Sequence, residues 1–103
     1  MISVNLKSSG LDLTDALRQY VETRMNSLEK HLRRYDPVGV RVDFEVARTT
    51  RHHRHGDVFY AEANLVLPGR TLRAAHEAPD IRAAVDKTKD ILIREIEKYK
   101  EQR

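Results

Sequence analysis

The last quarter of the chain, residues 79–103, constrains the fold more than any other stretch. It places core-type residues at helical spacing: Ile81, Ala84, Val85, Thr88, Ile91, Leu92, Ile96 and Tyr99. This periodicity predicts a long helix that buries one stripe of its surface. Pro79 suits the first helical turn, where a missing N–H costs nothing, and Asp80 complements the positive end of the helix dipole.

The same segment carries charged residues on both sides of its apolar stripe. At about 100° per residue, one edge of the stripe presents Lys87, Arg94 and Lys98, and the other presents Arg82, Lys89 and Lys100. We expect the acids on the outer face between these edges: Asp86, Asp90 and Glu97. Two interpretations remain open, a solvated helix with ion pairs between turns and a surface that binds phosphates.

A strand and a helix are predicted at the start of the chain. Period-two alternation over residues 2–7 predicts a strand with one buried face. Helical spacing then predicts a helix over about residues 14–34, with Thr14 as its N-cap. Asp36 and Pro37 should end it, because a residue before proline is pushed out of the helical region. Arg24 falls on the apolar side of this helix, either as a snorkelling arginine or as a cation held toward a ligand.

Three more strands follow in the middle of the chain. Alternation predicts a strand over residues 38–46, another over residues 59–67 and a shorter one over Arg70–Ala75. Pro68 and Gly69 are typical of the tight turn that closes a hairpin. The stretch between the first two of these strands breaks the pattern and should form a loop.

These segments predict a single α+β domain spanning residues 1–103, in the order β-α-β-β-β-α. A right-handed crossover should place the first two strands side by side and parallel, and the last three should form an antiparallel meander. Each strand has one apolar face. We therefore expect a four-stranded mixed sheet with both helices packed on one face, and the other face left to solvent or a partner.

Composition narrows the function. The formal net charge is +3, which permits a polyanionic partner without demanding one. The chain has no cysteine, which excludes disulfides, thiolate catalysis and Cys-ligated zinc. No apolar run approaches the ~20 residues of a membrane span, and the start lacks the apolar core of a signal peptide. We expect a cytoplasmic protein with no membrane partner.

A histidine cluster in the predicted loop is the obvious candidate for a metal site, with His52, His53 and His55. Adjacent loop histidines do not readily converge on one ion, and only Asp57 offers a carboxylate nearby. We expect no metal there, and interpret the loop as a basic hairpin connection or as a phosphate contact through its arginines. No nucleophile is recognisably paired with a base, and no Gly-rich phosphate loop is present. We therefore expect no enzymatic activity, cofactor or small-molecule substrate.

The remaining signal is the distribution of positive charge over the first helix, the loop and the last helix. If the helices lie side by side, their cationic edges can meet across a groove that suits an RNA backbone read by shape. We expect RNA contacts from Arg24, Lys30, Arg82, Lys87, Lys89, Arg94 and Lys98. The last three strands and two helices also echo the double-stranded-RNA-binding domain, by analogy only.

Two stretches resemble the family of ribosome hibernation promoting factors and ribosome-associated translation inhibitors. They are ALRQYVETRMNSLEKHL, residues 16–32, and APDIRAAVDKTKDILIREIEKYK, residues 78–100. The resemblance covers nearly the whole chain and matches in element order. It implies binding to the small ribosomal subunit and its ribosomal RNA, in the decoding region where messenger and transfer RNA would sit. It also implies that translation is inhibited and ribosomes are stored under stress.

Carried over by position, Arg24 matches a basic residue of the family's first helix. Lys87, Arg94 and Lys98 fall in its basic last helix, where Thr88 here replaces the usual Leu. The chain resembles either the short hibernation type or the N-terminal domain of a longer protein. Our leading hypothesis is a ribosome-binding inhibitor that acts by occupancy. The alternatives are a protein-interaction regulator that uses the polar sheet face or a free strand edge, and a general double-stranded RNA-binding module.

Overall fold

The computed structural model describes residues 2–33, 39–50 and 57–101. Its elements are β1 (Ser3–Ser9), α1 (Asp15–Asn26), the 3-10 helix η1 (Ser27–His31), β2 (Arg41–Thr50), β3 (Asp57–Leu67), β4 (Arg70–Ala78) and α2 (Ile81–Glu101). The strands form one sheet in the order β1-β2-β3-β4. β1 runs parallel to β2, and the other pairs are antiparallel. The predicted α+β class and topology are confirmed.

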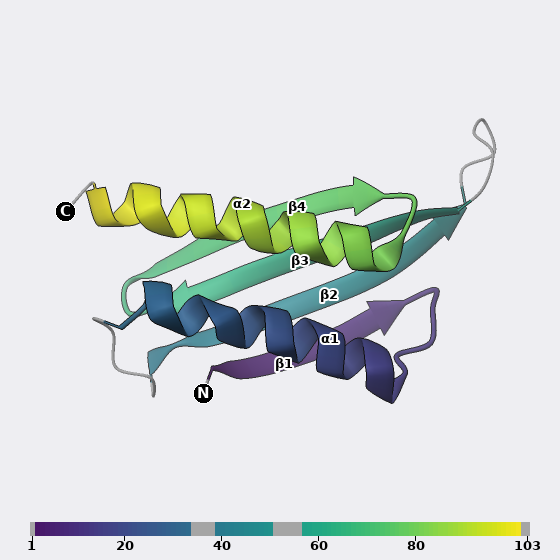
Figure 1. Ribbon diagram of the computed structural model, residues 1–103, viewed down its shortest axis with the longest axis horizontal. Helices are drawn as coiled ribbons and strands as arrows, with labels where there is room; N and C mark the ends of the chain where they lie inside the picture. Colours follow the sequence, from purple (N-terminus) through teal and green to yellow (C-terminus); the bar gives the residue numbers. More distant parts are fainter. Residues whose placement is uncertain (1, 34–38, 51–56, 102–103) are drawn as a thin grey trace.

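Both helices cover the same face of the sheet and lie side by side (Figure 1). α2 packs on β3 and β4, and α1 lies beside α2 toward β1. Period-two alternation explains this layering, because it turns one row of apolar side chains from every strand toward the helices. No helix in the described part of the chain is long and apolar enough to cross a membrane.

The core lies between the helices and the sheet. Leu28 is fully buried and Phe44 is 1% exposed, as the apolar patterns of the first helix and second strand predict. Thr88 of α2 is also fully buried, and its hydroxyl donates a hydrogen bond to the carbonyl of Ala61 in β3 at 3.2 Å. This bond satisfies the polar atom that Thr88 brings into the core.

The strands extend beyond the predicted boundaries near the hairpin that joins β2 and β3. β2 continues to Thr50 instead of ending at residue 46, β3 begins at Asp57, and β4 continues to Ala78. Ala47 and Arg48 show no clear alternation, yet they pair with Tyr60 and Phe59. Backbone pairing with the neighbouring strand continues past the point where apolar alternation stops. The side-chain pattern therefore could not predict this extension.

The predicted helix over residues 14–34 is an α-helix only in its first half, and it continues as a 3-10 helix to His31. Its start is confirmed, because the Thr14 hydroxyl accepts a hydrogen bond from the Leu17 N–H at 3.1 Å. The α-helix ends at Asn26 and tightens into η1. There the Asn26 Nδ2 donates to the Glu22 carbonyl at 2.8 Å, and the Ser27 Oγ donates to the Arg24 carbonyl at 2.6 Å. These side chains occupy carbonyls of the last helical turn and favour the change of helix type.

The start of α2 is fixed by a side-chain hydrogen bond, and two glycines allow backbone conformations with a positive φ. α2 begins at Ile81, and the Asp80 carboxylate accepts a hydrogen bond from the Ala83 N–H at 3.3 Å. Pro79 therefore precedes the helix and does not occupy its first turn. Gly69 has a φ of +80° in the predicted tight turn. Gly10 has a φ of +75° and lies so close to the Arg48 carbonyl that a Cβ would approach its oxygen to 2.6 Å, so this position needs glycine.

Candidate nucleic-acid interface

The helical layer has a line of contact between α1–η1 and α2 that we call the helix seam. It is formed by Tyr20, Arg24 and His31 on one side and Asp86 and Glu97 on the other. The sequence led us to expect Asp86 and Glu97 on the outer face of α2. They point toward α1 instead, so their expected outer position is wrong and acids line the seam together with cations. The seam is bridged by the Arg24–Asp86 ion pair and by a contact between His31 and Glu97.

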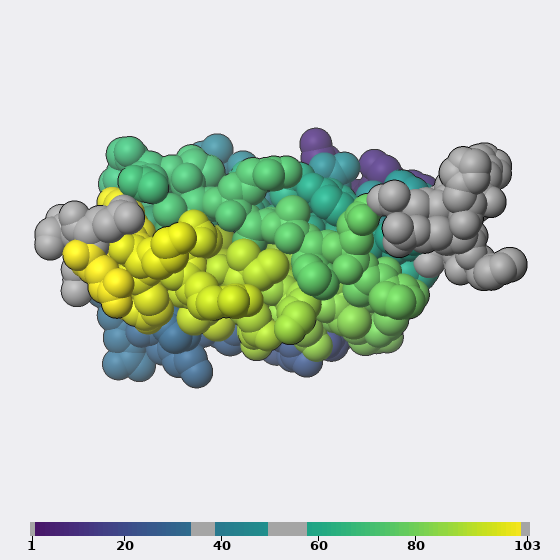
Figure 2. All heavy atoms as spheres, turned by 90° about the horizontal axis from the view of Figure 1, so that it is seen from above, coloured from purple at the N-terminus to yellow at the C-terminus, as the bar shows by residue number. Residues whose placement is uncertain are grey.

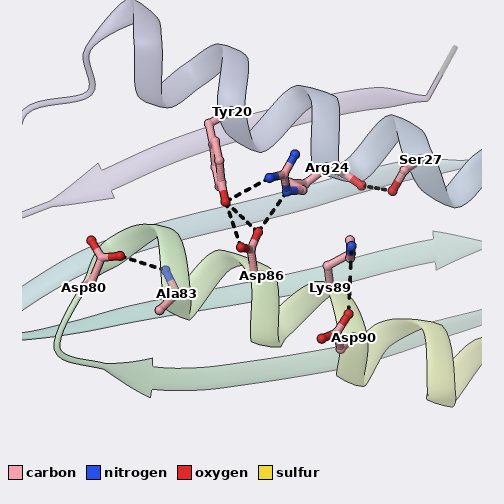
Figure 3. A network of polar contacts seen from close by, with 8 residues as sticks. All are labelled: Tyr20, Arg24, Ser27, Asp80, Ala83, Asp86, Lys89 and Asp90. Carbon is pink, nitrogen blue, oxygen red and sulfur yellow. Dashed lines mark hydrogen bonds and ion pairs between the residues drawn. The ribbon is translucent and has the colours of Figure 1, made fainter.

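One end of the seam holds a three-residue cluster (Figure 3). The Arg24 Nε donates to the Asp86 Oδ1 at 2.9 Å, and the Tyr20 hydroxyl lies 2.8 Å from both Asp86 oxygens. The Arg24 Nη2 also donates to the Tyr20 hydroxyl at 3.1 Å, and its guanidinium carbon lies 4.2 Å from the centre of the Tyr20 ring. Tyr20 and Arg24 are four residues apart, so they share a face of α1. Asp86 reaches them from α2.

The pKa shifts in this cluster follow from its geometry. Burial raises the pKa of Asp86, but hydrogen bonds from Tyr20 and Arg24 outweigh it, so the pKa falls below its usual value of 3.8. Burial, followed by the hydrogen bond to Asp86, raises the pKa of Tyr20 above 10.0. Asp86 therefore stays a carboxylate at neutral pH, and Tyr20 stays a hydroxyl donor.

The other end of the seam joins η1 to α2. The His31 Nδ1 lies 3.3 Å from the Glu97 Oε1, and the Lys100 Nζ lies 3.7 Å from the same oxygen. Arg82 also belongs to the seam, since its guanidinium lies 5.1 Å from the centre of the Tyr20 ring. The α2 edge that faces α1 is therefore the one that carries Arg82, Lys89 and Lys100.

The opposite edge of α2 carries Lys87, Arg94 and Lys98, which we call the outer cationic row. By helical geometry this row points away from α1, so its expected place in a groove between the helices is wrong. Lys87 and Arg94 are exposed, and neither has a carboxylate partner among the described residues. Lys98 pairs with Glu95 at 3.5 Å. Figure 2 shows the molecule from the side on which α2 and β4 lie at the surface.

The structure thus divides the seven predicted RNA-binding residues. It brings Arg24, Arg82 and Lys89 together at the seam, where Lys89 acts electrostatically on Asp86 and lies 3.9 Å from Asp90. Lys30 is exposed on η1 with no ion pair to another described residue. Lys87, Arg94 and Lys98 form the separate outer row. All seven lie in the helical layer.

The open face of the sheet is polar and internally paired. Glu62 accepts hydrogen bonds from Arg73 at 3.1 Å and from Asn64 at 2.9 Å, and a third from the Tyr60 hydroxyl. These bonds, the Arg73 bond first, lower the pKa of Glu62 from 4.5 to about 2. Arg41 pairs with Asp43 at 3.5 Å. A shallow hollow of about 380 Å³ on this face is lined mainly by polar residues, among them Asn5, Lys7, Asp43, Glu45, Glu62 and Asn64.

The sequence missed Tyr20 and Asp86 as parts of the site. The sequence patterns assign no role to Tyr20 and predict Asp86 as an outer acid. Asp86 lies four residues after Arg82 and three before Lys89, which places all three on one helix edge. That spacing is the sequence signal from which the place of Asp86 could have been predicted.

The His52, His53 and His55 cluster lies outside the described residues, and no metal-binding group of acids and histidines occurs among the described ones.

The sequence matches one family model and is similar to proteins named as ribosome hibernation factors. Residues 4–103 match the family model described as sigma 54 modulation protein / S30EA ribosomal protein. The ribosome hibernation promoting factor of Azotobacter vinelandii is 35% identical over 100 residues, which cover 97% of this chain and 84% of that protein. The ribosome hibernation promotion factor of Lactococcus lactis is 30% identical, and the match spans 97% of this chain but half of that protein.

A solved structure agrees with the sequence matches. The crystal structure of the Thermus thermophilus Protein Y N-terminal domain aligns with a TM-score of 0.68 and 27% identity. The alignment covers 96% of this chain and 99% of that one.

Proposed function

Since this chain belongs to the sigma 54 modulation protein / S30EA ribosomal protein family, we propose that it is a ribosome hibernation factor that binds the small ribosomal subunit. It occupies the decoding region and excludes messenger and transfer RNA, so translation stops without any chemical reaction. The relatives named as hibernation factors support the ribosome as partner. The helical layer is the part of this chain that fits ribosomal RNA.

The observation that carries the proposed face is the state of its cations. Lys30, Lys87 and Arg94 are exposed in the helical layer, without a carboxylate partner among the described residues. On the sheet face, Arg41 and Arg73 are already paired with acids, and Lys7 is exposed there without an ion pair to another described residue. Unpaired cations can neutralise phosphates and release counterions with all of their donors, whereas a paired cation offers only the donors that its acid leaves free.

The proposed contact reads RNA by backbone position and shape. Arginine offers planar donors that match a phosphate, and lysine offers a mobile point charge. Such contacts position a protein on RNA without reading its sequence, and the 2′-hydroxyls and phosphates of folded RNA supply the partners. The body of the protein then blocks the space that other RNA would need.

A charge-reversal pair tests the binding face. The helix-face reversal combines Lys87→Glu and Arg94→Glu, and its matched control, the sheet-face reversal, combines Lys7→Glu and Arg41→Glu. Both change the net charge equally, and all four positions are exposed. In sedimentation with purified small subunits, the helix-face reversal should lose affinity by about tenfold or more per position, and the control should change little.

A displacement experiment tests the decoding region. Small subunits carrying a short messenger RNA and a labelled transfer RNA are titrated with the parent protein. We expect release of both RNAs, and no release by the helix-face reversal at the same concentration. Full retention of both RNAs while the parent protein is bound would contradict occupancy of the decoding region. Loss of binding in the sheet-face reversal alone would instead favour a protein-interaction role for the sheet.

A further inference from the structure

We propose that Asp86 is a positioning residue for RNA binding, which holds Arg24 and Tyr20 across the helix seam so that Arg24 presents a fixed cation to a phosphate. This inference rests on the proposed function, because it assigns a role within the same helical face. Asp86 itself does not touch the RNA. It acts through the guanidinium that it holds.

Asp86 is the shared acceptor of the cluster. Its carboxylate receives the Arg24 Nε at 2.9 Å and the Tyr20 hydroxyl at 2.8 Å. Arg24 is further fixed by the Tyr20 hydroxyl at 3.1 Å and by its position 4.2 Å from the ring centre. An arginine that binds RNA from a mobile state gives up about 0.5–1.5 kcal/mol of side-chain freedom. Here that freedom is already lost in the unbound protein.

Arg24 keeps binding capacity after these contacts. Its side chain is 35% exposed, and its Nη1 group makes no hydrogen bond to another described residue. Figure 3 shows this third nitrogen free of any dashed line. Arg82 and Lys89 flank the cluster, so a phosphate that approaches Nη1 meets further positive charge.

Two effects of Asp86 on RNA affinity have opposite signs, which makes the role testable. Its negative charge repels phosphates, so electrostatics alone predicts tighter binding when the charge is removed. Its hold on Arg24 favours binding, so a positioning role predicts weaker binding. A partly exposed ion pair adds little to stability, so unfolding is not expected to mask the result.

The first experiment compares Asp86→Asn with the matched control Asp90→Asn. Both remove one negative charge from α2, but the described contact of Asp90 is a long one of 3.9 Å to Lys89. Binding of purified small subunits is measured at several salt concentrations. Asp86→Asn should bind about 3- to 10-fold more weakly than the parent, the effect expected from releasing one ordered side chain. Asp90→Asn should bind as tightly as the parent or more tightly.

A double-mutant cycle separates positioning from general damage to the fold. In an Arg24→Gln background, Asp86→Asn should no longer weaken binding, because the residue that it positions is gone. Damage to the fold would weaken binding in both backgrounds and would overturn the proposal. Tyr20→Phe keeps the ring and removes the shared hydroxyl, so it should weaken binding in the same direction. Thermal unfolding of each variant is recorded in parallel.

The outcomes distinguish this inference from the proposed function. If the helix-face reversal abolishes binding but Asp86→Asn binds as tightly as Asp90→Asn, the positioning role is overturned and the function stands. If the helix-face reversal binds like the parent, the outer cationic row is not the contact and that part of the proposed function is wrong. The positioning role is then decided by Asp86→Asn against Asp90→Asn alone, and equal binding of these two variants overturns it.

Discussion

Leu28 and Phe44 are two of the buried residues of the core between the helical layer and the sheet. Leu28 comes from η1 and Phe44 from β2, and the exposed fraction of each is 1% or less. Their positions follow from apolar periodicity alone, which is why sequence could identify them. Arg24 and Asp86 show the opposite case. Each was placed by periodicity within its own helix, but their contact depends on how two helices are rotated against each other.

Truncation of either core residue should be strongly destabilising. Leu28→Ala and Phe44→Ala should each lower the free energy of unfolding by about 2–5 kcal/mol, because each leaves a cavity between helix and sheet. Leu11→Ala, at the partly buried margin of the core, should cost less and serves as a control. Equilibrium denaturation measures all three. A loss below about 1 kcal/mol for Leu28 or Phe44 would contradict their place in the core.

Glu62 should make stability depend on acid pH. Its pKa is lower in the folded protein than the usual 4.5, so its carboxylate stabilises the fold above that pH. The contribution is lost as the pH falls toward its folded pKa of about 2. Glu62→Gln should therefore be less stable than the parent by about 1 kcal/mol at neutral pH. The difference should disappear as the pH falls through about 2.

Denaturation of the parent and Glu62→Gln across this pH range checks the effect. Glu45→Gln lies on the same face without an ion pair among the described residues, and it should show a smaller difference at neutral pH. A Glu62→Gln deficit that is unchanged at the acid end would show that the lost stability does not come from the charged carboxylate.

At the scale of elements, the sequence predicted which segments are helices and strands better than where they end. Alternation and helical spacing report burial, so they identified four strands and two helices correctly. The end of α1 depends on the side chains of Asn26 and Ser27, which bond to carbonyls of the preceding turn. The extension of β2 depends on pairing with β3. Neither effect changes the apolar pattern.

Asn26 links two elements and should matter more than an exposed polar residue. Its Oδ1 accepts a hydrogen bond from the Ile2 N–H at 2.8 Å, and its Nδ2 donates to the Glu22 carbonyl at 2.8 Å. Asn26→Ala removes both bonds and leaves a partly buried N–H unpaired, so it should cost about 1–2 kcal/mol. Asn5→Ala removes one exposed bond to Asp43 and should cost under about 0.5 kcal/mol. Equal losses in chemical denaturation would contradict the linking role.

At the scale of the molecule, the helix-covered side and the open side of the sheet differ in whether their cations are paired with acids. The helical layer keeps exposed cations without acid partners, and the open sheet face pairs its arginines with neighbouring carboxylates. Counting charges along the sequence identified the helical cations as candidates. It could not distinguish paired from unpaired ones, because an ion pair across the seam joins residues about sixty positions apart, such as Arg24 and Asp86.

The salt dependence of small-subunit binding tests the central claim most directly. Each phosphate contact that is lost should lower the slope of log affinity against log salt by about 1. The helix-face reversal should therefore bind weakly, with a slope lower by about 2, while the sheet-face reversal keeps the parent's affinity and slope. Circular dichroism confirms that both variants are folded. A folded helix-face reversal with the parent's affinity and slope would contradict the account.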